Sequence, residues 1–370
     1  MPTLNEEKTI RSCIEKIHQA FEELGMVGEI IIADSSTDRT SEIARSLGAI
    51  VVHPDYLGYG NAYLAGLASA RGRYIAIGDA DDTYDFRDLP KLVRRIDEGY
   101  DFVLGSRLKG EIRPGAMPRL HQYIGNPFLT WLLNKLFNTD ISDAHSGFRV
   151  IQRDALEQLD LRTGGMEFAS EMFIEAAKKG LCIGEVPITY WPRVAPSKLN
   201  SFRDGWRHIR FMLLYRPIPF IAVPGLVFTF FGLFMMLFFY LQGDIETSSM
   251  HSFILAALAF IGGLQALLMG VMIKVYSVIH GYSDKSRFIG QFMHYYNLER
   301  ELILGLLLIC GGVAIGLGII YEWVAGGFGD LYQITNAVWS LTLFLSGMQI
   351  VFSAIIISMM LVNQKSDEVE

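Results

Sequence analysis

The chain has 370 residues and a formal net charge of −7, with 39 acidic and 32 basic side chains. This acidic balance argues against a nucleic-acid-binding protein, which would normally be basic. The three cysteines, Cys13, Cys182 and Cys310, are too few and too widely spaced for a disulfide framework or a metal cluster.

The first 200 residues alternate between the periodicities of helices and of strands. Apolar spacing predicts helices over residues 6–24, 40–47, 61–70, 88–98 and 166–179, and buried strands over 29–34, 49–53, 74–78 and 102–105. Strands that alternate with helices predict an α/β fold with a mostly parallel sheet that is covered on both faces. Ligands bind such sheets beyond the carboxyl ends of the strands, where Asp34, Asp79 and Asp81 fall.

The predicted strand over 74–78 is followed by closely spaced carboxylates. Asp79 and Asp81 are separated by one residue, and two carboxylates at this spacing can share a hard divalent cation such as Mg²⁺ or Mn²⁺. Such a cation neutralises a diphosphate and helps it to depart as a leaving group. An acidic turn after a strand is the alternative interpretation, because the pattern is short.

The last 150 residues have the composition of a membrane domain. Four runs without a charged residue, over 218–242, 250–273, 302–321 and 336–363, are each long enough to cross a bilayer as a helix. The loops over 243–249 and 322–335 contain no Lys or Arg, whereas the loop between the second and third runs contains Lys274, Lys285, Arg287 and Arg300. The positive-inside rule therefore predicts that the N-terminal domain, the central loop and the C-terminus are cytoplasmic.

A basic and aromatic segment precedes the first run. Its Arg, Trp, Phe and Leu residues predict an amphipathic helix at the inner surface of the membrane. The predicted organisation is thus a catalytic domain over 1–202, an interfacial helix over 203–217, a four-helix membrane domain over 218–363 and a cytoplasmic tail over 364–370.

Five segments in the first 200 residues carry motifs. Three of them are Pro2-Thr-Leu-Asn5-Glu6, the segment 31–40 and Asp79-Ala-Asp81. They resemble, in that order, the P-x-x-N-E opening, the V-V-D-D-G-S-x-D-x-T segment and the D-x-D metal site of the inverting family 2 glycosyltransferases, which have the GT-A fold. The segments 143–149 and 193–199 resemble D-x-x-S-G-F and R-x-x-x-S-K-L of the dolichol-phosphate mannose synthase and polyprenyl-phosphate glycosyltransferase branch.

The sequence departs from this family pattern at three places. The family has a whole strand before P-x-x-N-E, but only Met1 precedes Pro2 here, so we expect that the first strand is missing and that a backbone ladder is left unpaired. Ala33 replaces the first Asp of the D-D pair. Thr83 stands where the mannose synthases often have a Gln that helps to hold the metal.

The resemblance implies roles for individual residues. It implies substrate-binding roles for Pro2, Asn5, Glu6, Asp34, Ser36, Asp38, Gly60, Asn61, Asp79, Arg107, Ser146, Glu171 and Ser197. It implies catalytic roles for Asp81, Arg119, Arg193 and Lys198, and a Mg²⁺ or Mn²⁺ ion held by Asp79 and Asp81.

Several of these residues also have a simpler interpretation. Asp34 can accept a hydrogen bond from a base N–H, or it can be a helix N-cap or a turn residue. Asp38 can start a helix. The turn Gly58-Tyr-Gly60 suits a close backbone approach to phosphate, although a plain loop is equally compatible with it.

An anionic lipid acceptor requires cations, and arginine forks suit phosphate geometry. The resemblance implies this role for Arg107, Arg119, Arg193 and Lys198. In many relatives an acidic residue near Glu171 acts as a base, but a phosphate acceptor is already ionised and needs no strong base. Glu171 can instead cap, orient a cation or pair with Arg149.

The sequence thus predicts a membrane enzyme that moves one sugar from a nucleotide-diphosphate sugar to a polyprenyl phosphate at the cytoplasmic leaflet, with a possible homo-oligomeric state. One alternative is another lipid or glycan acceptor, such as diacylglycerol. A second is a processive polysaccharide synthase, which is disfavoured because the chain has no Q-x-x-R-W. A third is a transporter or scaffold whose N-terminal domain has lost its catalytic residues. The presence of Asp79, Asp81 and the basic residues assigned to the acceptor argues against it.

Overall fold

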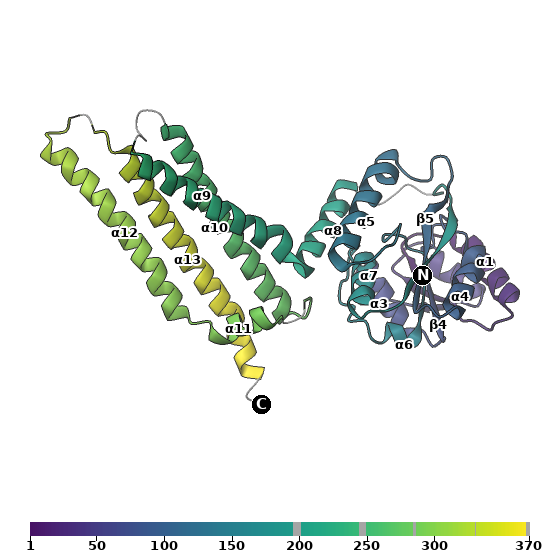
Figure 1. The fold of residues 1–370 in the computed structure, drawn as a ribbon. Coiled ribbons are helices and arrows are strands. Elements are labelled where there is room, and N and C mark those ends of the chain that lie inside the picture. Colours follow the sequence, from purple (N-terminus) through teal and green to yellow (C-terminus); the bar gives the residue numbers. More distant parts are fainter. Residues whose placement is uncertain (195–200, 244–248, 284–285, 330, 368–370) are drawn as a thin grey trace. The chain divides into compact units, whose positions relative to one another are not determined.

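The structure is a computed structural model that describes residues 1–194, 201–243, 249–283, 286–329 and 331–367. It divides into two compact units, Met1–Phe211 and Met212–Glu370. The first unit contains strands and helices, and the second contains helices (Figure 1). The predicted α/β unit followed by a helical membrane region is therefore confirmed.

The strands of the first unit form two hydrogen-bonded sheets. The strands are β1 (Pro2–Thr3), β2 (Ile31–Asp34), β3 (Ile50–Val52), β4 (Tyr74–Ile77), β5 (Phe102–Ile112), β6 (Arg149–Gln152) and β7 (Ile183–Tyr190). Their order is β1-β2-β3 in one sheet and β4-β6-β5-β7 in the other. The β1–β2, β2–β3 and β5–β7 pairs are parallel, and β6 is antiparallel to both of its neighbours. The sheet was predicted to be mostly parallel, and β6 and β7 were not predicted.

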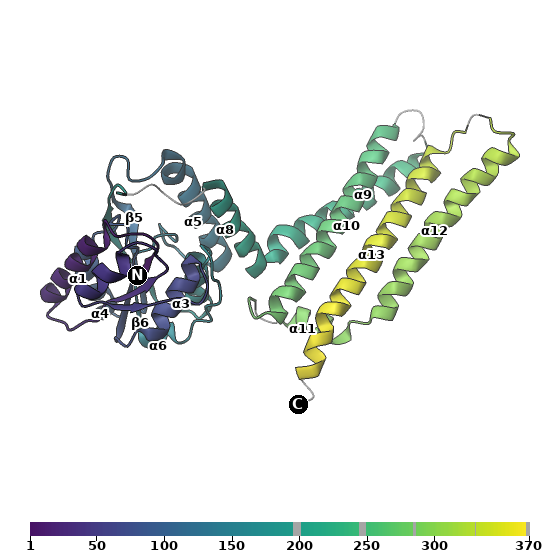
Figure 2. The same ribbon diagram turned by 180° about the vertical axis from the view of Figure 1, so that it is seen from behind.

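Helices cover both faces of this sheet arrangement. They are α1 (Ile10–Leu24), α2 (Thr40–Ser46), α3 (Tyr59–Ser69), η1 (Phe86–Asp88), α4 (Leu89–Asp97), η2 (His121–Gly125), α5 (Asn126–Phe137), α6 (Arg153–Leu156) and α7 (Phe168–Lys178). Helices α1 and α4 lie on one face, and α3 and α7 lie on the other (Figures 1 and 2). The apolar faces of α1 and α4 supply much of the core, including Ile10, Ile14, Leu92 and Ile96.

Two predicted elements of the first unit have limits that differ by more than two residues from those in the structure. Helix α1 begins at Ile10 rather than at residue 6, because residues 6–9 form a turn in which the Glu6 carbonyl accepts from the N–H groups of Thr9 and Ile10. Strand β5 continues to Ile112 instead of ending at Gly105. The apolar pattern stops early in the strand because the residues after Arg107 are largely exposed. These residues still pair with β7 after a register shift.

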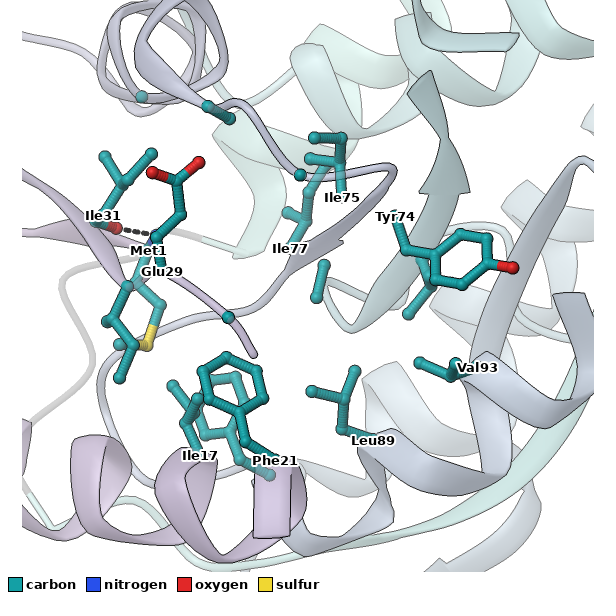
Figure 3. Close-up of a pocket in the computed structure, with 18 of the residues that line it drawn as sticks. Met1, Ile17, Phe21, Glu29, Ile31, Tyr74, Ile75, Ile77, Leu89 and Val93 are labelled. Atoms are coloured by element: carbon teal, nitrogen blue, oxygen red, sulfur yellow. Dashed lines mark hydrogen bonds between the residues drawn. The ribbon is translucent and has the colours of Figure 1, made fainter. Parts of the chain in front are cut away.

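The two sheets are separated by a cavity of about 450 Å³ between β2 and β4. Ile31, Ile75, Ile77 and Leu89 point into it (Figure 3). The strand expected to be missing is present only as the two-residue β1, which pairs with β2. The terminal amino group of Met1 donates to the carbonyl oxygen of Ile31 at 2.8 Å, so the ladder expected to be unpaired is partly satisfied.

The second unit is helical, and it is preceded by α8 (Ser201–Tyr215), which crosses from one unit to the other. The helices are η3 (Ile218–Ala222), α9 (Val223–Gln242), α10 (Met250–Ile279), α11 (Arg287–Tyr295), α12 (Leu298–Ala325) and α13 (Ile334–Asp367). Four spans in the described residues, Ile218–Gln242, Met250–Ile279, Leu298–Ala325 and Ile334–Val362, are long and apolar enough to cross a membrane. The four predicted runs are confirmed.

Three of these helices are longer than the predicted runs, because a helix does not end where charged residues begin. The predicted tail over 364–370 starts within α13, which continues to Asp367. Helix α8 ends at Tyr215, before the predicted limit of 217, because Pro217 has no backbone N–H to continue it. The remaining domain boundaries stay predictions.

Glycines allow neighbouring helices of the second unit to approach closely. A Cβ atom on Gly232 of α9 would lie 2.3 Å from the backbone nitrogen of Phe260 in α10. A Cβ atom on Gly347 of α13 would lie 2.5 Å from the carbonyl oxygen of Gly305 in α12. Small residues at helix contacts are typical of packing within a membrane.

Candidate active site

Asp34 is the last residue of β2, and its carboxylate accepts hydrogen bonds from three hydroxyl groups. Thr3 and Ser36 donate to Oδ1 at 2.6 and 2.5 Å, and Ser41 donates to Oδ2. Burial by itself would raise the pKa of Asp34, but these hydrogen bonds outweigh it and hold the pKa below its ordinary value. Asp34 is 2% exposed, so it orders this turn, and its contact with a nucleotide base stays a prediction.

Asn5 and Asp38 complete the same turn. The backbone of Asn5 is left-handed, with φ of 56°, and its N–H donates to Ser36 Oγ at 2.7 Å. Its side-chain oxygen accepts from the N–H of Thr37 at 2.9 Å. Asp38 accepts from the N–H of Thr40, the first residue of α2, at 3.0 Å, so its side chain is engaged in the turn that precedes this helix.

Asp79 follows β4 and meets two tyrosines that the sequence analysis missed. Tyr59 and Tyr63 of α3 donate their hydroxyls to Oδ1 at 3.0 and 3.2 Å. The backbone of Gly147 approaches so closely that a Cβ atom there would lie 2.7 Å from Oδ2. Burial, followed by the charge of Asp81, raises the pKa of Asp79 to about 6, although the tyrosine hydroxyls oppose the shift. The spacing of the tyrosines, four residues apart on one helix face, is the only signal in the sequence.

The guanidinium of Arg193 lies between two predicted site carboxylates. Its Nη2 is 3.2 Å from Glu6 Oε1, and its Nε is 3.2 Å from Asp81 Oδ2. The other oxygen of Asp81 accepts from the N–H and the hydroxyl of Thr83, at 3.1 and 2.6 Å. Three segments that are distant in the sequence, namely the start of the chain, the loop after β4 and the segment after β7, therefore meet at this point.

Helix α1 holds the loop after β4 in place. Lys16 and Ser12 bind the carboxylate of Asp82 at 2.7 and 3.0 Å, and Thr9 donates to the carbonyl oxygen of Ala80 at 2.7 Å. Asp82 has a left-handed backbone, with φ of 62°. None of these residues was predicted, although Thr9, Ser12 and Lys16 share one face of the helix.

The oxygens at this position suit a divalent cation. Within the described part of the chain, no group of three or more His, Cys, Asp or Glu side chains is placed to hold a metal. Mg²⁺ commonly takes one or two protein carboxylates and completes its shell with phosphate oxygens and water. A cationic group, the guanidinium of Arg193, already lies beside Asp81. The donor chemistry of Asp81, with Asp79 two residues away, therefore fits Mg²⁺ or Mn²⁺.

Arg107 forms a buried bidentate ion pair. Its Nε and Nη2 donate to the two carboxylate oxygens of Asp143 at 2.7 and 2.8 Å. Both residues are buried. In the structure, Arg107 is thus bound to Asp143, the first residue of the segment over 143–149. A contact of Arg107 with acceptor phosphate stays a prediction.

The segment over 143–149 is held by a second buried arginine. Arg149 donates to the carbonyl oxygens of Ser146, Ala144 and Ala169 at 2.6, 3.1 and 2.7 Å. Ser146 is fully buried and accepts from the N–H of Phe148 at 3.4 Å. This segment therefore presents the backbone of Gly147, rather than the Ser146 hydroxyl, to Asp79.

Glu171 does not pair with Arg149. It is fully buried, and its oxygens accept from the N–H groups of Arg162 and Thr163 at 3.1 and 2.9 Å and from the Thr163 hydroxyl at 2.6 Å. Burial raises the pKa of Glu171, although these hydrogen bonds oppose the shift. The predicted alternative in which Glu171 pairs with Arg149 is wrong, because Arg149 is engaged with backbone carbonyls.

The glycine turn before α3 is explained by the backbone of a neighbouring segment. A Cβ atom on Gly58 would lie 2.3 Å from the carbonyl oxygen of Gly164. A Cβ atom on Gly60 would lie 2.0 Å from the carbonyl oxygen of Thr163. Asn61 donates its N–H to the carbonyl of Gly164 at 3.2 Å. The backbone of residues 163–164 thus approaches this turn closely, and a contact of the turn with phosphate stays a prediction.

The remaining predicted residues lie apart from this cluster or outside the described residues. Arg119 is exposed at the start of the helix that leads into η2. Pro2 contributes backbone to β1 opposite Ala33. Ser197 and Lys198 lie outside the described residues.

Comparison with known proteins assigns both units to known sequence families. The profile described as glycosyl transferase family 2 matches residues 1–160, and the profile described as glycosyltransferase family 2 C-terminal transmembrane region matches residues 271–361. These matches cover the candidate site up to β6 and the last two spans.

Several similar curated proteins come from Haloferax volcanii. The chain is 44% identical over 361 residues to the low-salt glycan biosynthesis hexosyltransferase Agl6, which covers 96% of this chain and 87% of the relative. It is 35% identical over 207 residues to a dolichyl-phosphate hexose transferase, which covers 55% of this chain and 87% of the relative. Among solved structures, glucosyl-3-phosphoglycerate synthase from Mycobacterium tuberculosis is similar at 27% identity and a TM-score of 0.48, over 58% of this chain and 76% of that chain.

Proposed function

Because the chain belongs to glycosyltransferase family 2 and is a membrane glycosyltransferase, we propose that it transfers one sugar from a nucleotide-diphosphate sugar to a polyprenyl phosphate, such as dolichyl or undecaprenyl phosphate. A phosphate oxygen of the lipid attacks the anomeric carbon, the bond from that carbon to the diphosphate breaks, and the nucleoside diphosphate leaves. Attack from the opposite side inverts the configuration.

The single observation that carries this proposal is the position of Arg193 between Glu6 and Asp81. Two carboxylates and a guanidinium at the carboxyl edge of the strands suit a reaction between two phosphate-bearing substrates. The dolichyl-phosphate hexose transferase among the relatives supports a lipid phosphate as the acceptor.

The proposed roles of the residues follow from their charges. Asp81 and Asp79 would hold Mg²⁺ or Mn²⁺, which neutralises charge on a departing diphosphate. The nucleotide would bind beside Asn5, Glu6 and Asp34. The same proposal assigns the attraction of the acceptor phosphate to four basic residues, namely Arg107, Arg119, Arg193 and Lys198.

The acceptor chemistry does not need a general base. A lipid phosphate is ionised at neutral pH, so no proton has to be removed from the nucleophile. Glu171 is fully engaged with the Arg162–Thr163 backbone, which agrees with a reaction that does not use it as a base.

We place the reaction on the cytoplasmic side of the membrane. The loop between α10 and α12 carries basic residues, whereas the loops after α9 and α12 carry none. Under the positive-inside rule, the first unit then faces the cytoplasm, where nucleotide sugars are made.

The decisive experiment offers a panel of labelled UDP- and GDP-sugars, with Mg²⁺ and polyprenyl phosphate, to the full chain reconstituted in vesicles. We expect one lipid-linked product from one donor, release of the sugar by mild acid, and nucleoside diphosphate in equal amount. A ladder of longer products would instead support a processive synthase. An acid-stable, base-labile glycolipid would identify a diacylglycerol acceptor.

A further inference from the structure

Two histidines and a serine form a hydrogen-bonded group in the first unit that the proposed reaction does not use. Ser170 lies in the first turn of α7 and is fully buried. Its hydroxyl oxygen lies 2.7 Å from Nδ1 of His208 in α8 and 3.4 Å from Nε2 of His145. The two imidazole rings also pack edge to face, with centroids 4.8 Å apart. This group, called here the histidine bridge, therefore joins α7, α8 and the segment over 143–149.

The surroundings of His145 set the direction of the hydrogen bonds in the histidine bridge. Burial, followed by the charges of His208 and of two arginines, holds the pKa of His145 well below its ordinary value, so the ring is neutral. The arginines are Arg107 and Arg149. Nδ1 of His145 is buried and has no hydrogen-bond partner among the described residues, and buried N–H groups without an acceptor are rare. The proton therefore lies on Nε2, which donates to Ser170, and the single hydroxyl proton of Ser170 is left for His208.

The histidine bridge holds a segment whose backbone lies against the site. Gly147, two residues after His145, has no room for a side chain, because a Cβ atom there would lie 2.7 Å from Oδ2 of Asp79. The N–H of Gly147 donates to the hydroxyl of Tyr84 at 2.8 Å. A change in the position of the His145 ring would therefore be passed to the backbone beside Asp79.

A second neighbour of Asp79 rests on the same turn of α7. Tyr63 donates to Asp79 at 3.2 Å, and its ring stacks on that of Phe168, with centroids 5.1 Å apart and an angle of 5° between the planes. Phe168 is the first residue of α7. Both Tyr63 and Gly147 thus depend on the first turn of α7 for their positions, and His208 binds α8 to this turn.

We infer that His208 is a positioning residue for the transfer reaction, because it fixes, through Ser170 and His145, the backbone that lies against Asp79. This inference rests on the proposed function, in which Asp79 helps to hold the metal ion. His208 acts through other residues, so its loss should slow the chemical step more than it weakens the binding of either substrate. A misplacement of about 1 Å within a site can lower the rate of a reaction by about 100-fold.

Four variants of the full chain test the inference. His208→Leu keeps an apolar side chain but removes the nitrogen that accepts from Ser170, whereas the amide of His208→Asn can place a polar atom near the position of Nδ1. Ser170→Ala removes the hydroxyl at the centre of the histidine bridge. His18→Leu, at an exposed histidine of α1, is the control.

The first measurement is the kinetics of sugar transfer to polyprenyl phosphate by the reconstituted proteins. We expect kcat to fall by about 10–100-fold in His208→Leu and Ser170→Ala, with both apparent KM values changed by less than about twofold. His208→Asn should recover most of the lost rate, and His18→Leu should match the unchanged protein. The double variant should be no slower than Ser170→Ala, because the two residues act through one hydrogen bond. A rise in either KM with an unchanged kcat would overturn the inference.

The second measurement is hydrogen–deuterium exchange of the full chain, read by mass spectrometry, which needs no activity. Exchange over 143–149 should be faster by about tenfold in His208→Leu and Ser170→Ala, while exchange in β2 stays unchanged. Unchanged exchange over 143–149 would overturn the inference. An equal rise in β2 would also overturn it, because the histidine bridge would then support stability alone. If the unchanged protein transfers no sugar from any donor of the panel, the proposed function fails, and the exchange measurement decides by itself whether His208 positions the segment.

Discussion

The Nε atom of Arg193 lies 3.2 Å from Oδ2 of Asp81, and this contact joins the segment after β7 to the loop after β4. The same guanidinium reaches Glu6 at 3.2 Å. Residues assigned to the acceptor and to the metal therefore share one small region, in which bound cations and anions must affect each other.

Replacement of Asp81 by Asn should abolish sugar transfer while the protein stays folded, because the side chain loses the charge that attracts the divalent cation. A metal ion contributes several kcal/mol to the stabilisation of charge in a transition state, so we expect a loss of at least about two orders of magnitude in kcat. Asp85→Asn is the control, because Asp85 pairs with Arg87 in the next turn. Mn²⁺ binding, measured by electron paramagnetic resonance, should fall in parallel. Full activity of the Asp81→Asn protein in EDTA would disprove the metal hypothesis.

Removal of the Tyr63 hydroxyl should move the acid limb of the pH–rate profile. The hydroxyl donates to Asp79 and so favours the ionised carboxylate, whose pKa is about 6. Tyr63→Phe should raise this pKa by about one to two units, since a hydrogen bond to a charged group contributes about 1.5–3 kcal/mol. Asp79 then remains protonated to a higher pH, and the acid limb of kcat/KM should shift upward. Tyr56→Phe should leave the limb in place, and an unshifted limb in Tyr63→Phe would show that ionisation of Asp79 does not limit the reaction.

Loss of the Arg119 guanidinium should affect the acceptor and spare the donor. A charge-assisted contact with phosphate that is lost while its partner stays desolvated costs about 2–4 kcal/mol. Arg119→Ala should therefore raise the apparent KM for polyprenyl phosphate, or lower kcat, by about one to three orders of magnitude. Nucleotide binding, measured by calorimetry, should be unchanged, as it should be in Arg94→Ala, where another surface arginine is removed. Weaker nucleotide binding with an intact response to lipid would reassign Arg119 to the donor diphosphate.

Replacement of Arg107 by Met should destabilise the first unit. The change leaves the buried carboxylate of Asp143 without its bidentate partner, and breaking a buried pair in this way costs about 3–5 kcal/mol. The free energy of unfolding is measured by denaturant titration of the full chain in detergent. Arg94→Gln, which breaks an exposed pair with Glu23, should change it by less than about 1 kcal/mol. Equal effects of the two replacements would mean that the Arg107–Asp143 pair contributes no special stability.

The proposed membrane topology predicts opposite labelling of two serines. In a protein whose Cys182 and Cys310 are replaced by Ser, a cysteine at Ser249 should react with an impermeant thiol reagent added outside intact cells. A cysteine at Ser286, in the loop with basic residues, should react only after the cells are opened. The reverse pattern would place the first unit outside the cytoplasm.

The sequence by itself determined the features that depend on local patterns. Apolar runs longer than the thickness of a bilayer predicted the four spans, and alternation of periods predicted the α/β unit, because burial of an apolar face requires a matching repeat. The spacing of Asp79 and Asp81 after a strand placed them at the carboxyl edge of the sheet. Each of these features depends on a continuous stretch of a few to a few dozen residues.

Only the tertiary structure decided which side chains meet. Arg193 reaches Glu6 across 187 positions, and Lys16 reaches Asp82 across 66, so neither contact leaves a local pattern. The structure also separated arginines that look alike in the sequence. Arg107 is bound to Asp143 inside the unit, whereas Arg119 is exposed. Burial and hydrogen-bond partners depend on how distant segments pack, and that packing decides whether a charged residue holds the protein together or faces a substrate.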